Sequence, residues 1–134
     1  MSETSDEKTL AEAVDALADR FRAMPQSRLL GAVPGHPSRA AAGLALARWL
    51  ALTAQAAEAV RADGGADGRS ARELPDAGAF AVGDQLAVVG HDLAAALAAL
   101  PGDAAVALPD GPAVPAGEVR ALAVRRLAEA SAAL

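Results

Sequence analysis

The segment GDQLAVVGHDLAAAL, residues 83–97, places one of the two histidines of the chain among carboxylates and an amide. Asp84, Gln85, His91 and Asp92 are side-chain types that can hold a ligand or move a proton, in a segment otherwise rich in Val, Leu and Ala. On a helix, Asp84 and His91 fall about 20° apart and therefore share one side. These side chains could form the polar wall of a small-molecule pocket.

The side of the helix that carries Asp84 and His91 also carries Val88, so it is not an ordinary solvated surface. A helix that is apolar nearly all round is usually central in a fold or lies at an interface. One interpretation is that His91 makes a structural hydrogen bond to a backbone carbonyl or to Asp84, and so orients the bundle or a dimer contact. The other is a ligand or partner face made of Asp84, Gln85, Val88, His91 and Asp92.

A metal site is not predicted. Zinc and similar ions need at least three convergent ligands, and His36 is the only other imidazole. Neither the H-x-x-H nor the E-x-x-H spacing, which would place two ligands on one side of a helix, includes these histidines.

The stretch GAVPGHPSR, residues 31–39, contains the elements of an anion site at a helix N-terminus. Gly35 allows close approach of a ligand, and His36, Ser38 and Arg39 could donate hydrogen bonds to it. The alternative is a Pro/Gly turn in which Ser38 caps the following helix.

Motifs for nucleophilic catalysis or nucleotide binding, such as G-x-S-x-G, G-x-x-x-x-G-K-[ST] and G-x-G-x-x-G, do not occur. The chain contains no cysteine, which excludes disulfides, thiolate metal sites and thiol catalysis by the protein itself. We therefore predict no catalytic residues and no cofactor.

The elements that position these residues follow from hydrophobic periodicity. In residues 10–24 the apolar positions alternate in steps of four and three, which predicts an amphipathic helix that Pro25 ends. Similar patterns predict helices over about 37–63, from Val82 or Gly83 to about 100, and from about Ala116 to the end, with a short helical turn after Pro25. Segments 64–79 and 101–116 are predicted loops, and residues 1–8 are predicted to be disordered.

The second of these loops contains LPDGP, a turn signature between two short runs that carry Val and Leu. It predicts a small β-hairpin. The alternative is an extended loop, because Pro109, Pro112 and Pro115 recur every three residues as in polyproline II.

Four amphipathic helices in 134 residues favour a single mainly α domain over residues 1–134, a four-helix bundle with a small β-hairpin before the last helix. Trp49 lies on the apolar side of the second predicted helix and is predicted to be core. Alanine-rich helices bury little area each, so a homodimer would add useful stability.

Charge is unevenly distributed along the chain. Residues 1–19 hold six acidic residues and one lysine, whereas residues 20–61 hold six arginines and one glutamate. The net charge of −5 argues against a nucleic-acid partner, because an acidic chain repels the phosphate backbone. A regulator that binds nucleic acid would use the arginines of the basic region, namely Arg20, Arg22, Arg28, Arg39 and Arg48.

The polar start and the absence of a long apolar run without charge predict a cytoplasmic protein without a membrane span.

The segment FAVGDQLAVVGHDLAAAL, through Phe80, Val82, Asp84 and His91, resembles a helix of the DinB-like bundles, which include the N-terminal domain of mycothiol-dependent maleylpyruvate isomerases. The resemblance covers less than a fifth of the chain and implies a four-helix bundle. Members of that family bind a divalent metal through three histidines, and this chain has two.

The sequence thus predicts an interaction or binding module without catalytic activity, with a protein partner or a second copy of the chain as the main partner. The alternative is a degenerate DinB-like enzyme or small-ligand-binding protein centred on His91.

Overall fold

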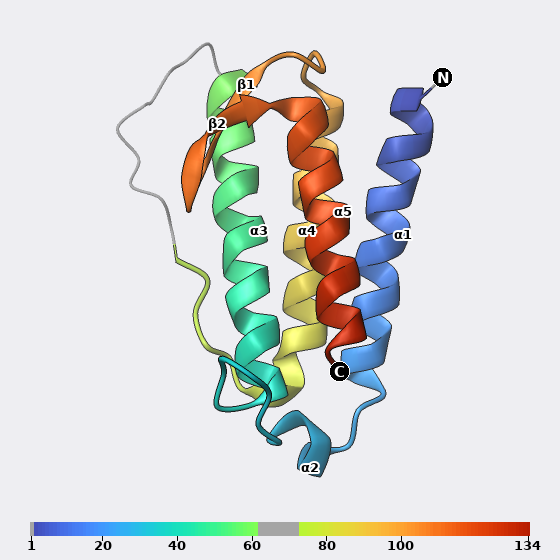
Figure 1. Cartoon of the computed structure of the whole chain (residues 1–134), viewed down its shortest axis with the longest axis vertical. Helices are drawn as coiled ribbons and strands as arrows, with labels where there is room; N and C mark the ends of the chain where they lie inside the picture. Colours follow the sequence, from blue (N-terminus) through green and yellow to red (C-terminus); the bar gives the residue numbers. More distant parts are fainter. Residues whose placement is uncertain (1, 62–72) are drawn as a thin grey trace.

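The computed structural model describes residues 2–61 and 73–134, with side chains from residue 9 onward. The elements follow in the order α1 (Ser2–Arg22), α2 (Gln26–Leu29), α3 (Arg39–Arg61), η1 (Ala79–Ala81), α4 (Val82–Ala98), β1 (Ala105–Leu108), β2 (Gly111–Pro115) and α5 (Ala116–Ala132). The four long helices form a bundle, α2 closes one end, and the hairpin β1–β2 lies at the other end (Figure 1). The mainly α fold with a hairpin before the last helix is therefore confirmed.

The helices form where hydrophobic periodicity predicts them. In α1 the apolar positions Leu10, Val14, Leu17 and Phe21 are all buried. The large apolar residues of α4 other than Val88 are buried in the same way, and burial of each such side chain contributes about 1.5–3 kcal/mol. The core therefore runs along the inner sides of the four long helices.

Two pairs of long helices run parallel. Helices α3 and α4 point the same way, whereas α1 and α5 run in the opposite direction (Figure 1). Helix α4 packs between α3 and α1, and α1 also packs against α5. Helices α3 and α5 touch each other only sparingly, so one side of the bundle stays partly open.

Glycine permits the close approach of α1 to α4. A Cβ atom on Gly90 would lie 2.5 Å from Cγ2 of Val14, and one on Gly83 would lie 2.9 Å from the carbonyl oxygen of Ala18. Real Cβ atoms do not approach neighbours this closely, so the two helices could not pack at this distance with larger residues.

The hairpin settles the alternatives for the segment before the last helix. Its strands pair antiparallel through Ala105 with Pro115 and Val106 with Val114, so the polyproline alternative is wrong. Pro109 and Asp110 form the turn between Leu108 and Gly111, in agreement with the LPDGP signature. Val106 is fully buried and anchors the hairpin on the core beside α3.

Helix boundaries differ from the prediction at two places. Helix α1 begins at Ser2, within the segment 1–8 for which the sequence predicts disorder, and Met1 lies outside the described residues. Helix α3 begins at Arg39, not at Pro37. Of the predicted loop 64–79, residues up to 72 lie outside the description, 73–78 have no regular structure, and Ala79 opens η1.

Candidate functional site

The face predicted around His91 is the outer side of α4, next to α1. His91 does not pair with Asp84. Its Nε2 lies 2.7 Å from Oδ1 of Asp15 on α1, and Asp84 accepts a 2.8 Å hydrogen bond from Nε of Arg22 at the end of α1. The two pairs join α4 to α1 along the surface of the bundle, and all four side chains are at least 44% exposed.

The other three predicted residues of this face have separate environments. Gln85 donates to the carbonyl of Pro75 at 2.8 Å and so attaches the preceding loop to α4. Asp92 is exposed, and Val88 is 62% exposed, which is unusual for a large apolar side chain. Neither cavity described below is lined by His91. The structure thus brings these residues to one surface without forming a pocket from them.

The ion pair of Arg22 has a direct electrostatic consequence. The hydrogen bond to Asp84, followed by a weaker effect of Asp19, raises the pKa of Arg22 above its ordinary value. The two carboxylates therefore stabilise the charged form of this guanidinium.

The residues predicted as an anion site are used in three different ways. Ser38 Oγ accepts a 3.0 Å hydrogen bond from the amide of Ala41, so Ser38 is the N-cap of α3. Nη1 of Arg39 donates to the carbonyl of Arg28 at 3.2 Å. His36 is exposed and its backbone pairs with Val33 across a turn at Gly35, which has a φ of 84°. This is the capped Pro/Gly turn that the sequence analysis gives as the alternative.

The five arginines considered for nucleic-acid binding all donate to acceptors of the same chain. Arg20 and Arg28 bind the C-terminal end of α5, through Ser131 and the carbonyl of Leu134. Arg48 donates to the carbonyl of Leu74 at 2.8 Å. With the partners of Arg22 and Arg39 given above, the basic region serves to connect elements of the fold.

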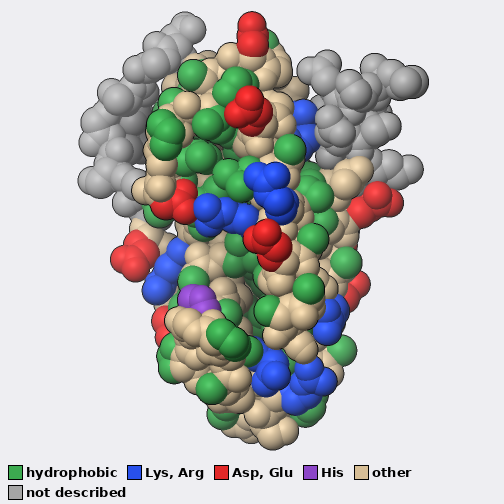
Figure 2. Space-filling view, viewed as in Figure 1, with side chains coloured by type: hydrophobic (Ala, Val, Ile, Leu, Met, Phe, Trp, Pro, Cys, Tyr) green, Lys and Arg blue, Asp and Glu red, His purple; other side chains and the backbone are tan. Residues whose placement is uncertain are grey.

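An open groove lies between α3 and α5. It is a groove of about 600 Å³, within the range of small-molecule sites in proteins. Its walls are lined mainly by apolar residues of α3, α5 and the turn before α3, and its polar residues are His36, Arg126 and Glu129. In Figure 2 hydrophobic side chains follow the seam between these two helices, with charged side chains beside it. The wall residues are Val33, Pro34, Ala42, Ala45, Leu46, Trp49, Leu122, Ala130 and Ala133.

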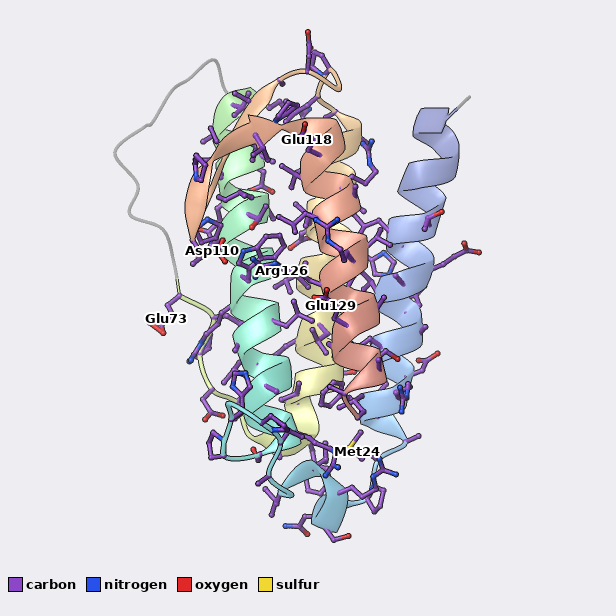
Figure 3. The ribbon with its side chains drawn as sticks, in the orientation of Figure 1. Met24, Glu73, Asp110, Glu118, Arg126 and Glu129 are labelled. Carbon is purple, nitrogen blue, oxygen red and sulfur yellow. The ribbon has the colours of Figure 1, made fainter. Side chains whose placement is uncertain are left out.

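Three side chains close the groove at the hairpin. The indole Nε1 of Trp49 donates to Oδ1 of Asp110 at 2.9 Å, and Nη2 of Arg126 donates to Oδ2 of the same carboxylate at 2.8 Å. The guanidinium of Arg126 lies over the Trp49 ring, 4.4 Å from its centre, in a cation–π contact. Figure 3 shows Asp110 and Arg126 pointing toward each other from the hairpin and α5, with Glu129 one turn further along α5.

Asp110 is stabilised in its charged form by these two donors. The hydrogen bond from Trp49, followed by that from Arg126, lowers the pKa of Asp110 below its ordinary value of 3.8. The hairpin turn is therefore held over the groove by an ionised carboxylate at neutral pH.

Sequence reasoning identified Trp49 as core, and it is 7% exposed, but missed its place in this cluster. A buried indole usually needs an acceptor for its N–H, and Asp110 in the predicted turn carries a carboxylate that can serve as one. Nothing in the sequence indicates that this turn lies beside Trp49. The contact depends on how the hairpin folds back on α3, which a linear pattern does not show.

Among residues 9–61 and 73–134, no group of three or more His, Cys, Asp or Glu side chains is placed to hold a metal ion. None of the described helices is both long and apolar enough to cross a membrane.

Comparison of the chain with family models, with curated proteins and with solved structures found no match. The resemblance to DinB-like bundles therefore remains a prediction.

Proposed function

We propose that this protein is a non-catalytic binding module that takes up a small, largely apolar organic molecule in the groove between α3 and α5. The observation that carries the proposal is the groove itself, an open space of about 600 Å³ walled by apolar side chains where the bundle does not close. This proposal retains the binding module that the sequence predicts, but it places the binding site at the groove beside Trp49 and not at the face around His91.

The chemistry of the groove indicates the kind of ligand. The alanines of α3 and α5 leave room, while Leu46, Leu122 and Trp49 offer apolar contact area. His36, Arg126 and Glu129 provide donors and an acceptor at the edge for one polar group of the ligand. Because Arg126 is already paired with Asp110, it adds orientation more than net positive charge.

Trp49 makes the proposal easy to test, because it is the only tryptophan and the chain has no tyrosine. The dye 1-anilinonaphthalene-8-sulfonate serves as a probe. Bound in the groove, it should quench Trp49 emission and accept its excitation energy at saturable concentrations. Native mass spectrometry of the protein purified without chelator should then show whether a cellular ligand is retained.

Matched variants locate the binding. Ala45→Phe fills the groove from the α3 wall, whereas Ala95→Phe places the same side chain at an exposed position on α4. We expect the first to abolish energy transfer from Trp49 and the second to leave it unchanged. Equal dye binding in both variants would show that the groove is not the site.

A second function, self-association through the outer side of η1 and α4, is favoured by two exposed apolar side chains. Phe80 is 69% exposed and Val88 is 62% exposed, although most large apolar residues of the described chain are buried. A second copy of the chain would cover Val88 together with Asp84, His91 and Asp92, which surround it on the same face.

The two functions separate in one experiment. Light scattering coupled to size-exclusion chromatography should give a dimer for the wild type and a monomer for Val88→Glu if α4 is the interface. Dye binding in the groove should be the same in both. A monomeric wild type at about 100 μM would reject the dimer, since a useful interface binds more tightly than this.

A further inference from the structure

Arg120 on α5 is buried, and its Nε has no hydrogen-bond partner among the described residues. It is 4% exposed, and its Nε is shielded from solvent without a hydrogen bond. Within the described part of the chain, no hydrogen bond or ion pair involves its guanidinium, whereas Arg126 two turns further along α5 is paired with Asp110. Arg120 faces the core because it falls in the buried series Ala116, Arg120, Ala123 and Leu127, spaced by four, three and four.

A buried guanidinium without an anion is energetically costly. Arginine carries its positive charge in proteins even where it is buried. Burial of an unpaired charge costs several kcal/mol even after relaxation of its surroundings, and a bound anion offsets this cost. An apolar residue at this position would avoid that cost, so the buried charge of Arg120 points to a bound anion.

A cavity lies directly beside Arg120. It has a volume of about 250 Å³ and is lined by Thr9 of α1 and by Arg120, Ala121 and Val124 of α5. It lies between α1 and α5 and shares no lining residue with the groove between α3 and α5. Among the described lining residues, the cavity thus combines the positive charge of Arg120 with the apolar side chains of Ala121 and Val124 and with Thr9.

We propose that this cavity binds a small organic carboxylate, with the carboxylate paired to Arg120 and a short aliphatic chain against Ala121 and Val124. The planar guanidinium can give two parallel hydrogen bonds to a carboxylate. A monoanion matches the single buried cation, whereas a phosphate dianion would lose more hydration than one guanidinium replaces. The volume suits a molecule of a few carbon atoms, below the usual range for larger ligands.

The test is a calorimetric and thermal-unfolding titration with acetate, propionate and butyrate, and with chloride and inorganic phosphate at the same ionic strength. We expect saturable stabilisation by the carboxylates, strongest for those with an aliphatic chain, and none beyond the ionic-strength effect for chloride and phosphate. Phosphate binding as strong as that of butyrate would overturn the choice of ligand. Absence of any carboxylate-specific shift in the wild type would overturn the site.

Three variants assign the effect to Arg120. Arg120→Met should weaken butyrate binding more than about tenfold, because a buried charge pair is lost. Arg125→Met, which removes an exposed arginine of the same helix, should not weaken it. Val124→Phe keeps the charge but fills the cavity, so it tests the site even if Arg120→Met does not fold. Unchanged butyrate binding in Val124→Phe and Arg120→Met would reject the proposal.

Discussion

The seams α1–α4 and α3–α5 show two different ways for helices to meet in one bundle. At α1–α4, Gly90 and Gly83 let the helices approach, and the ion pairs Arg22–Asp84 and His91–Asp15 cross the outside. At α3–α5, Trp49 and Arg126 stand at the interface and the helices remain apart. Small residues such as Gly83 and Gly90 allow two helices to pack closely. The large ring of Trp49, held by Arg126 and Asp110, keeps α3 and α5 apart and leaves a groove between them.

The largest effect is expected where the closed seam is tightest. Gly90→Leu puts a side chain where even a Cβ would lie 2.5 Å from Val14, so we expect a loss of about 3 kcal/mol in the free energy of unfolding. Urea denaturation followed by circular dichroism measures it. Gly117→Ala is the control, because a Cβ there meets only the Gly102 carbonyl at 3.5 Å, and it should be neutral or stabilise by up to about 1 kcal/mol. Similar results for both variants would show that the seam is not tightly packed.

The hairpin contact at the open seam should matter less. Asp110→Asn removes the charge that accepts from Trp49 and Arg126, and we expect about 1 kcal/mol of destabilisation because the carboxylate is partly exposed. The emission maximum of Trp49 should shift as its indole N–H loses a charged acceptor. An unchanged emission spectrum together with unchanged stability would mean that Asp110 does not hold the hairpin in solution.

The same contact predicts a dependence on pH. Because the pKa of Asp110 is lower in the folded protein than its ordinary value of 3.8, this group stabilises the fold above that value. The contribution should be lost as pH falls through the lower, folded pKa. Unfolding free energies measured from about pH 6 to about pH 3 should therefore fall less steeply for Asp110→Asn than for the wild type. Parallel curves would contradict the assignment.

The smallest effect is expected at the surface of the closed seam. His91→Gln removes an ion pair whose side chains are 47% and 59% exposed, so it should change stability by less than about 1 kcal/mol. A double-mutant cycle with Asp15→Asn measures the coupling between the two side chains. A loss well above this, or loss of a bound molecule in native mass spectrometry, would return His91 to the centre of a functional site.

The fold followed from the sequence because its signals are local. Steps of four and three in α1 and α4, the Pro25 stop and the LPDGP turn each determine an element from neighbouring residues. The contacts of His91 were not predictable in the same way. Asp84 and His91 do share the outer side of α4, but that side borders α1, so each pairs with a residue of α1 and not with the other.

The two cavities were missed for different reasons. The groove exists because α3 and α5 do not meet, which depends on the packing of all four helices. Arg120 had a signal in the sequence, since it occupies an apolar position in the repeat of α5. A charged residue at an apolar position of an amphipathic helix is a sign that its charge has a partner or a ligand, and Arg120 is such a residue.

The order of the helices has a consequence for synthesis on the ribosome. Helix α1 is made first but packs mainly against α4 and α5, and Arg20 binds Ser131 near the far end of the chain. The apolar side of α1 therefore has no native partner until residues beyond 82 have left the exit tunnel. During that interval Leu10, Val14 and Leu17 of the nascent chain lack the contacts that bury them in the folded protein, and α1 can join the core only after α4 has been synthesised.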